Sequence, residues 1–322
     1  MSCAPVCYPK STQILMEKIV IKQIRFTVLA VPALFLSTLF VAPVSRAQST
    51  EPTQTTGVDK LYVLDCGLGH GNDMGHVFEN EVDVGVPHDD PVHCYLIHHA
   101  TKGWFLFDTG ISDFVASMSN GWQAGDASEG VHWTRPKGTV LSQLVAIGVK
   151  PSDIHMMALS HSHPDHMGNI EEFPDAILYV QKDEYEFAFS PGHVLSQPAG
   201  QPWVSWRKEH PVKLLIGDTD VFGDGSVMLI ATPGHTPGHQ SCMVHLPQTG
   251  WVILTGDAFH KGANFEWDRV PHLDGMDTIS RLETLTSMQR IYYLADHFHA
   301  QVWINHDPTD SAKHQYAPFS YQ

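Results

Sequence analysis

The sequence predicts an α/β fold, with helices covering β-sheets, built as one domain over residues 59–322. Runs typical of strands alternate with runs typical of helices, and several strand-like runs are apolar throughout, as strands in helix-covered sheets are. Hydrophobic residues make up 43% of the 322-residue chain, which is enough for one large core. No internal repeat and no second composition regime divides the domain further.

The individual elements follow from local patterns of apolar residues. Leu141, Leu144 and Val145 share one face of a helix expected at residues 139–147, and similar patterns predict helices at 182–189 and 275–298. Short β-rich or apolar runs predict strands at residues 61–64, 94–98, 104–107, 154–159, 176–180, 212–216, 227–231, 242–245, 252–255 and 301–304.

The first 47 residues are typical of a secretory signal. Residues 26–44 carry no charge, Lys18, Lys22 and Arg25 precede them, and small residues surround a cleavage position at Ala47. This order of basic, apolar and small-residue regions predicts a signal peptide over residues 1–47 and export to the periplasm or medium.

An uncleaved membrane anchor is the alternative, because the apolar run nearly reaches the length needed to span a bilayer. Pro32, Pro43 and the cleavage position favour the signal instead, so no membrane contact is expected after cleavage. Translation begins at Met1 or Met16. Residues 48–58 are polar and are expected to form a flexible linker.

Charge argues against nucleic acid as a partner. The formal charge is −16, and because the first 47 residues contribute +4, the remainder carries about −20. A surface this acidic repels phosphate backbones, whereas a small neutral substrate is compatible with it. The sequence leaves the oligomeric state open, a homodimer included.

Three cysteines remain after the predicted cleavage: Cys66, Cys94 and Cys242. The number is odd and no CxxC spacing occurs, so a disulfide framework is not expected. Cys94 and Cys242 lie in apolar, strand-like runs and are expected to be buried as small hydrophobic residues.

Histidine occurs 22 times, more often than Lys and Arg together, and it is the commonest metal ligand. Four potential ligands fall within six residues directly after a predicted strand: His161-Ser162-His163-Pro164-Asp165-His166. In an extended stretch His161 and His163 point the same way, while Pro164 forces a turn that brings Asp165 and His166 round from another side. The motif therefore predicts ligands for two neighbouring metal positions.

One motif cannot complete two metal sites, so further ligands are needed. His235 follows a Thr-Pro-Gly turn, Asp257 ends the apolar run Ile253-Leu254-Thr255-Gly256, and His306 follows residues 301–304. Each candidate comes at the end of a predicted strand, and such ends converge at one edge of a sheet. Each residue alone would be unremarkable, but the three together are a specific indication of a metal centre.

These motifs, in this order, resemble the metallo-β-lactamase superfamily, and the whole mature chain resembles its N-acyl homoserine lactone lactonases. The resemblance implies a four-layer αββα sandwich that serves as a catalytic domain. The segments that carry it are PVHCYL at residues 91–96, FDTG at 107–110, SHSHPDHMGN at 160–169, TPGHTPGHQS at 232–241 and NHD at 305–307.

The resemblance also implies two divalent metal ions and their ligands. Zn²⁺ is expected with such nitrogen and oxygen ligands, although Fe, Mn or Co can occupy similar sites. Asp108 would accept an imidazole N–H and so orient a ligand, or it is an ordinary polar turn residue. The implied ligands are His161, His163 and His235 for one metal, Asp165, His166 and His306 for the other, and Asp257 as the bridge.

The reaction implied is attack of a metal-bridging hydroxide on the ester carbon of a lactone, which quenches quorum sensing when the lactone is a signal. Asp165 would relay the proton to the departing alkoxide. The chain departs from the family pattern at His260, because related lactonases commonly carry a tyrosine three residues after the bridging aspartate. His260 would hydrogen-bond the substrate carbonyl in its place, or it is a solvated loop histidine.

Aromatic and methionine side chains near the motifs could form an apolar channel for an acyl chain, or they could be core residues, which is the commoner fate of aromatics. The acyl-chain preference does not follow from them. The candidates are Trp133, Met167, Phe187 and Phe259, with Phe189, Trp203 and Trp206 in the same regions.

Other functions are possible on this fold. A glyoxalase II-like thioesterase and an organophosphate hydrolase remain compatible with the motifs, whereas β-lactamases of the superfamily lack an acid at the position of Asp257. A non-catalytic binding protein is expected to have lost a ligand, and all seven are present. The acidic charge and the predicted export both oppose a nuclease.

Overall fold

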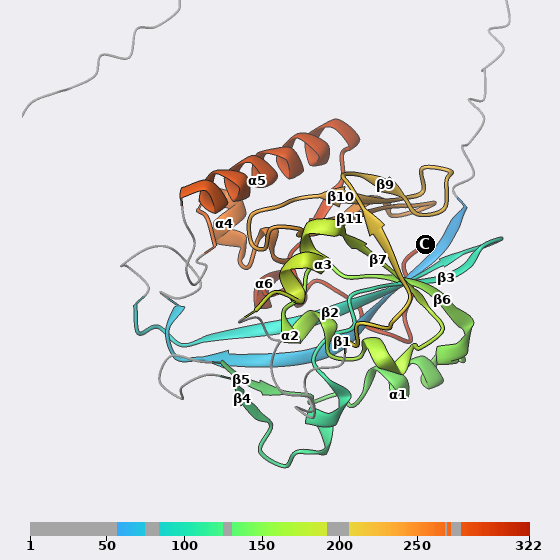
Figure 1. Ribbon diagram of the computed structural model, residues 1–322, viewed down its shortest axis with the longest axis horizontal. Helices are drawn as coiled ribbons and strands as arrows, with labels where there is room; N and C mark the ends of the chain where they lie inside the picture. Colours follow the sequence, from blue (N-terminus) through green and yellow to red (C-terminus); the bar gives the residue numbers. More distant parts are fainter. Residues whose placement is uncertain (1–56, 75–83, 125–130, 192–205, 268, 272–277) are drawn as a thin grey trace, which may run out of the picture. The chain divides into compact units, whose positions relative to one another are not determined.

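The computed structural model describes residues 57–74, 84–124, 131–191, 206–267, 269–271 and 278–322, and these residues form two β-sheets with helices around them (Figure 1). The predicted signal peptide and all but the end of the predicted linker lie outside the described residues. The linker prediction runs one residue too far, since Val58 is buried and begins the first strand.

The larger sheet has eight strands in the order β4 (Trp122–Ala124), β5 (Val131–Thr134), β1 (Val58–Gly71), β2 (His88–His99), β3 (Gly103–Phe107), β6 (Ile154–Ala158), β7 (Ile177–Gln181) and β8 (Val212–Leu215). The smaller sheet has five, in the order β13 (Gln301–Trp303), β12 (Gly250–Leu254), β11 (Gln240–Leu246), β10 (Val227–Ala231) and β9 (Thr219–Asp220). The α-helices of the described residues are α1 (Val140–Ala146), α2 (Pro164–Met167), α3 (Lys182–Ala188), α4 (Gly262–Trp267), α5 (Thr278–Phe298) and α6 (Pro308–Ser311).

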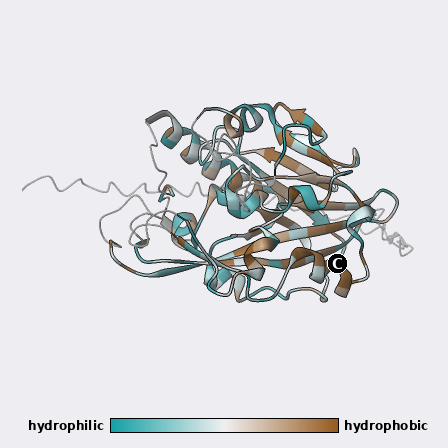
Figure 2. Ribbon diagram, turned by 60° about the horizontal axis from the view of Figure 1, so that its bottom comes forward, coloured by the Kyte–Doolittle hydropathy of each residue, from teal (hydrophilic) through white to brown (hydrophobic). Residues whose placement is uncertain are grey.

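Three hydrophobic clusters define the layers. Phe105 of β3 and Leu254 of β12 are fully buried in the cluster between the two sheets. The next residue in β3, Leu106, points to the opposite face and packs in a second cluster with Leu144 of α1. Ile291 of α5 packs in a third cluster on the outer face of the smaller sheet. Figure 2 shows hydrophobic stretches of ribbon in both sheets, and the arrangement confirms the predicted four-layer αββα sandwich.

Parallel strand pairs explain why the predicted ligands converge. β3 pairs in parallel with β6, and β12 pairs in parallel with β13, so the carboxyl ends of each pair lie together. Asp108 follows β3 and His161 follows β6 in the larger sheet, while Asp257 follows β12 and His306 follows β13 in the smaller one. The chain thus delivers functional side chains from neighbouring strand ends, as open α/β sheets generally do.

Every predicted strand and helix has a counterpart among the described residues, although the bounds differ and residues 275–277 of the last predicted helix lie outside them. β1 runs on to Gly71, well past the predicted end at residue 64. The prediction stopped early because residues 65–71 contain glycines and no β-branched residue that would indicate a strand. Gly69 lies against the Trp133 ring of β5, and a Cβ on Gly69 would lie 2.6 Å from that ring. The short strands β4, β5 and β9 and the short helices α2, α4 and α6 carry too few residues for a recognisable period.

Cys66 and Cys94 form a disulfide between β1 and β2, which the sequence did not indicate, so the expectation that Cys94 is simply a small buried hydrophobic residue is wrong. The two strands pair antiparallel, with Leu64 opposite Cys94, and an irregularity between Asp65 and Gly67 brings Cys66 beside Cys94. An odd cysteine count revealed nothing of this pairing. Cys242 is free and buried in β11, as predicted.

Among the described residues, none of the helices has both the length and the apolar character needed to cross a membrane.

Candidate metal centre

The HSHPDH segment leaves the end of β6 and turns back on itself. His163 keeps an extended backbone, and Pro164 then starts the single turn of α2, as the sequence predicted. The carbonyl of His166 accepts hydrogen bonds from the backbone N–H groups of Thr109 (2.7 Å) and Gly110 (3.2 Å), which fix α2 against the turn after β3. The potential ligands therefore stand on backbone that is held from two sides.

Three imidazoles and a carboxylate form the first cluster, and their ligand atoms lie within 4.8 Å of one another. His235 Nε2 lies 3.2 Å from His161 Nε2 and 3.1 Å from His163 Nδ1. Asp257 Oδ2 completes the cluster at 3.3 Å from His235 Nε2 and 3.7 Å from His161 Nε2. The three nitrogens converge on one point, as ligands of a single cation do.

Asp165, His166 and His306 form the second cluster. Asp165 Oδ2 lies 3.4 Å from His166 Nε2 and 3.3 Å from His306 Nε2. The remaining oxygen of Asp257, Oδ1, lies 3.2 Å from each of these two imidazole nitrogens. Asp257 thus directs one carboxylate oxygen to each cluster, the geometry expected of a bridging ligand.

A tight turn places Asp257 between the clusters. Gly256, which follows β12, has φ +54°, and a Cβ there would lie 2.6 Å from the Ser160 Cβ. Only glycine fits at this position without displacing Ser160, the residue directly before the HSHPDH segment. The Asp257 backbone N–H then donates to His239 Nε2 over 2.9 Å, which fixes the carboxylate in place.

The polar atoms in the centre fit a cation better than they fit one another. Asp257 Oδ1 and His166 Nε2 are both buried and neither has a hydrogen-bond partner, although buried polar atoms are almost always satisfied. Neighbouring imidazole nitrogens of the first cluster cannot all donate to each other. Lone pairs aimed at a common point are satisfied by bound metal ions, so the donor set fits the predicted cofactor.

In the first cluster, electrostatics set the protonation states that metal binding requires. Burial lowers the pKa of His161 and of His235 well below the usual range, so both rings are neutral near pH 7. Burial would raise the pKa of Asp257, but the His306 and His166 rings outweigh it and hold that pKa well below its usual value. Neutral imidazoles and an ionised carboxylate are the forms that bind metal.

In the second cluster, unlike the first, the pKa values of the histidines are raised. Burial lowers the pKa of His306, but the Asp257 and Asp165 carboxylates outweigh burial and raise it to about 10. The pKa of His166 is raised for the same reason, burial being outweighed by Asp257 and Asp165. A cation that binds at the second cluster therefore displaces protons from these two rings.

Comparison with known proteins places the chain in a family. Residues 88–306 match the model of the Metallo-beta-lactamase superfamily. The N-acyl homoserine lactonase AttM of Azorhizobium caulinodans is 33% identical over 248 residues, which cover 74% of this chain and 89% of that protein. The N-acyl homoserine lactonase AiiA of Bacillus thuringiensis subsp. kurstaki is 32% identical over 241 residues, 73% of this chain and 88% of AiiA. The chain belongs to the metallo-β-lactamase superfamily, in its N-acyl homoserine lactonase branch.

Solved structures agree with this membership. An N-acyl homoserine lactone hydrolase with the product N-hexanoyl-L-homoserine at its catalytic metal center superposes with a TM-score of 0.69 at 26% identity, over 82% of this chain and 99% of that one. The predicted fold and family are confirmed. Membership of this branch of the metallo-β-lactamase superfamily also confirms the prediction of a hydrolase that acts on ester bonds.

Asp108 holds His166, a potential metal ligand, in place. Its Oδ2 lies 3.0 Å from His166 Nδ1 and accepts from Ser160 Oγ at 2.8 Å, while Oδ1 accepts from the Ser160 N–H at 2.6 Å. Donation from Nδ1 to Asp108 leaves His166 Nε2 free to face the centre. The contact favours the predicted orienting role over that of an ordinary turn residue.

Replacing Asp108 with asparagine should lower metal affinity at the second cluster by about 10- to 100-fold, the usual cost of losing an outer hydrogen bond to a ligand. The amide has a single acceptor oxygen, so either the His166 ring or the Ser160 backbone N–H must face an NH₂ group in place of a carboxylate oxygen. Competitive titration of the metal-free protein with Zn²⁺ and a chromophoric chelator measures the change. Asp175→Asn, on the surface, is the matched control, and equal affinities in the two variants would contradict the prediction.

Two residues that hold the ligands in place were not predicted from the sequence. His239 bonds Thr232 O through Nδ1 (3.0 Å) and receives the Asp257 N–H, so it acts on a ligand rather than as one. Glu184 on α3 is fully buried and accepts hydrogen bonds from both loops that carry the first cluster. Burial would have marked Glu184 as a candidate, but the sequence does not show it, because a Glu in an amphipathic helix is usually exposed.

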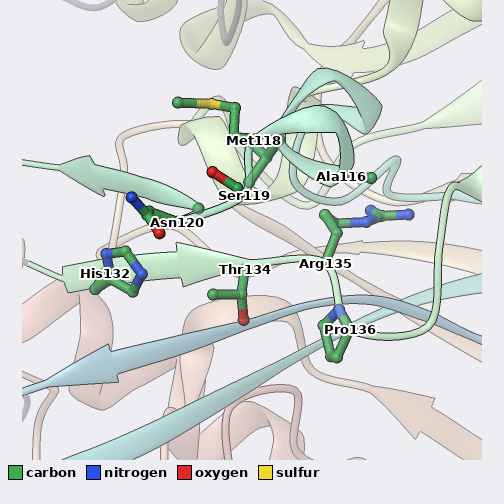
Figure 3. Close-up of a pocket in the computed structure, with 10 residues that line it drawn as sticks. Ala116, Met118, Ser119, Asn120, His132, Thr134, Arg135 and Pro136 are labelled. Carbon is green, nitrogen blue, oxygen red and sulfur yellow. The ribbon is translucent and has the colours of Figure 1, made fainter.

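The predicted pocket residues are largely core residues. Met167 and Phe259 have no exposed surface and pack in the hydrophobic clusters, so the structure corrects the expectation that they line an open pocket. Trp133 is 9% exposed and points to the core, whereas its neighbours His132 and Thr134 line a cavity of about 520 Å³ on the other face of β5 (Figure 3).

Among the other candidates, Phe187 belongs to α3 and Phe189 directly follows it. Trp206 packs against Phe189, with ring centres 5.2 Å apart, in the core cluster. Phe187 is half-buried, and its place in a pocket stays a prediction, while Trp203 lies outside the described residues. A separate cavity of about 560 Å³ borders the segments that follow His260 and His306, with Lys261 and Asp307 in its lining.

Proposed function

We propose that this protein opens the lactone ring of N-acyl homoserine lactones with two divalent metal ions, Zn²⁺ being the expected metal. The observation that carries the proposal is the position of Asp257, whose two oxygens face two complete ligand clusters. The similarity to AttM and AiiA supports the substrate class. A lactone that is neutral suits the acidic chain, and destruction of such signals would quench quorum sensing.

His161, His163 and His235 would hold one ion and His166, His306 and Asp165 the other, with Asp257 between them. When bound, such a pair of ions polarises the ester carbonyl and lowers the pKa of a water towards neutrality, so that hydroxide is available for attack. The protein's own part is to position these ions and to manage protons. No covalent intermediate on a side chain is needed.

Asp165 is placed to carry the proton that the departing alkoxide requires. Its side chain is 12% exposed, the most accessible of the carboxylates in the centre, and Oδ2 faces both His166 and His306. An oxygen that is not engaged by the ion can take a proton and release it to the ring oxygen. We assign this relay to the Asp165 carboxylate.

His260 lies at the rim of the centre. Its Nε2 is 3.1 Å from Asp257 Oδ2, and its ring centre is 4.9 Å from that of His235 and 5.5 Å from that of His306. Contact with both sides of the centre supports a substrate role over that of a solvated loop residue. We assign His260 the hydrogen bond to the substrate carbonyl that a tyrosine provides in related lactonases.

His260→Phe should reduce kcat/KM for a homoserine lactone by about 100-fold, because one well-aimed donor to a developing oxyanion contributes about 3 kcal/mol. His260→Tyr should retain most of the activity, since the hydroxyl restores a donor. Steady-state kinetics on the purified variants, with metal content measured in parallel, checks this. If His260→Phe matched the unaltered protein, the side chain would have no part in the reaction.

The decisive test of the proposed function is incubation of the metal-loaded protein with short- and long-chain N-acyl homoserine lactones, followed by mass spectrometry. The expected product is heavier by one water. A thioester, a phosphotriester and a chromogenic β-lactam in parallel assays separate the other hydrolases of this fold. Absence of product from every lactone would exclude the substrate class, and two bound metals per chain would still argue for a metallohydrolase.

Export remains part of the proposal. The Cys66–Cys94 disulfide supports it, because disulfides persist in oxidising compartments and are rare in the cytosol. Cell fractionation with antibodies against the protein, and N-terminal sequencing of the mature form, tests both the compartment and cleavage after Ala47. Recovery of the uncleaved chain in the cytosol would refute the export proposal.

A further inference from the structure

Glu184 is a buried carboxylate, and no ion pair joins it to another residue in the part of the chain that the structure describes. It lies in the first turn of α3, has 0% exposure and accepts four hydrogen bonds. Oε1 accepts from Ser162 N (2.7 Å) and Ser162 Oγ (2.6 Å), and Oε2 accepts from Thr236 Oγ1 (2.5 Å) and Gly238 N (3.2 Å). Burial raises the pKa of Glu184, while these hydrogen bonds oppose the rise.

The partners of Glu184 come from the two loops that carry the three histidines of the first cluster. The first of these loops continues into Asp165 and His166 of the second cluster, but that part of it is held separately, by the hydrogen bonds from Thr109 and Gly110 to the His166 carbonyl. Ser162 separates His161 from His163, and Thr236 directly follows His235. Gly238 lies so close to α3 that a Cβ on it would be 2.1 Å from the Glu184 backbone nitrogen. One carboxylate therefore joins two loops that are more than 70 residues apart in the chain, since His163 and His235 are separated by 72 positions.

A different buried ion supports the second cluster. Lys261 is 6% exposed, and its Nζ donates to Asp90 Oδ1, Asp89 O and His306 O, each at 2.6 Å. The His306 ring is itself directed by a contact of 3.1 Å between Nδ1 and Pro91 O. Lys261 thus ties the start of β2 to the backbone of His306, and among the described residues its ammonium group donates neither to the HSHPDH segment nor to the loop of His235.

We infer that the two metal positions are supported independently: Glu184 is the positioning residue of the first cluster and Lys261 that of the second. The inference rests on the proposed two-metal centre and does not depend on the lactone substrate. Neither side chain faces the metal positions directly. Each sets the spacing of ligands by holding the backbone beside them, and each therefore controls the affinity of one site.

Substitution of Glu184 by glutamine shows why the effect should be local. Glutamine has the same shape, but only one of its two terminal atoms accepts hydrogen bonds. Either the Ser162 N–H or the Gly238 N–H must then face an NH₂ group, and neither backbone donor can reverse its role. One loop of the first cluster should shift, while the Lys261 contacts stay intact.

The test measures metal binding to each cluster alone. His306→Ala leaves the first cluster as the stronger site, and His235→Ala leaves the second. Metal-free protein of each background is titrated with Zn²⁺ against a chromophoric chelator, with and without Glu184→Gln. Loss of an outer hydrogen bond to a metal site typically costs about 10- to 100-fold in affinity, and we expect this loss only in the His306→Ala background.

Lys261→Met should give the reverse pattern, because it keeps the aliphatic chain and removes the three donated hydrogen bonds. Glu186→Gln, on the exposed side of α3, is the matched control and should change neither affinity. Thr236→Val removes a single donor at constant shape, so it remains informative if Glu184→Gln unfolds. It should weaken the first cluster in the same direction but by less.

Equal weakening of both clusters by Glu184→Gln, or an unchanged first cluster in both Glu184→Gln and Thr236→Val, would overturn the inference. Metal analysis of the unaltered protein tests the two-metal centre separately. A protein that binds only one ion would refute that part of the proposed function, while weakening of the remaining first site by Glu184→Gln would still support the role of Glu184. Inactivity towards lactones bears on neither result.

Discussion

Asp257→Asn should abolish most of the activity, with kcat/KM lower by about a thousandfold or more. A metal ion that polarises a carbonyl contributes several kcal/mol to the transition state, and about 4 kcal/mol corresponds to about a thousandfold in rate. The asparagine amide presents one oxygen, so only one of the two clusters keeps a ligand at this position. The NH₂ group faces the other cluster, where it repels a cation.

Metal content should fall together with activity. We expect about one ion per chain in Asp257→Asn after dialysis, against two in the unaltered protein, as elemental analysis can show. The matched control is Asp183→Asn, an exposed carboxylate on α3, which should retain both metal and activity. An Asp257→Asn protein with two ions and ordinary kinetics would mean that the oxygens facing the two clusters do not bridge them.

The ligands of the centre could be predicted from the sequence because their chemistry and their position in the chain coincide. His161, Asp257 and His306 are ligand-type residues, and each follows a run of apolar residues that reads as a strand. Parallel pairing of β12 with β13 then brings two of them to one edge. Side-chain type and strand ends are local properties, so no knowledge of the tertiary structure was needed.

The supports of the centre were not predictable in this way. Glu184 reads as an ordinary helix residue, and only the packing of α3 against two loops buries it. The role of Lys261 depends on the separation between β2 and the loop after β13, elements that lie far apart in the sequence. Met167 and Phe259 failed as pocket residues for the same reason: whether a large side chain is core or lining is decided by neighbours.

The disulfide illustrates a third kind of difficulty. Cys66 and Cys94 are 28 residues apart, and they meet only because β1 and β2 pair in a register that includes an irregularity at Asp65 to Gly67. The number of cysteines in a sequence does not reveal the register in which two strands pair. The bond also lies beneath the turn that carries Asp108, since a Cβ on Gly110 would be 2.4 Å from the Cys66 Cβ.

Removing this bond with the double variant Cys66→Ala, Cys94→Ala should lower the free energy of unfolding by about 3 kcal/mol. A closed loop of 28 residues restricts the unfolded chain by an amount that the loop-entropy relation puts at about 3–4 kcal/mol. For a domain of this size the melting temperature should fall by roughly 6–10 °C. Urea unfolding followed by circular dichroism, with metal saturating, measures the free energy directly.

The reducing agent dithiothreitol provides the control. With both proteins prepared from Gln48 onwards, it should lower the stability of the unaltered protein towards that of the double variant and leave the variant unchanged, because Cys242, the cysteine left in that chain, is free and buried. Equal unfolding midpoints for the two proteins under oxidising conditions would contradict the prediction.

The folded variant should stay active, because Cys66 supports the turn that carries Asp108 through its backbone. The Cys66 carbonyl accepts hydrogen bonds from Ile111 N at 3.1 Å and from Arg135 Nη1 at 2.6 Å. The disulfide therefore stabilises the domain, while hydrogen bonds that survive its loss keep the ligand-bearing turn in position.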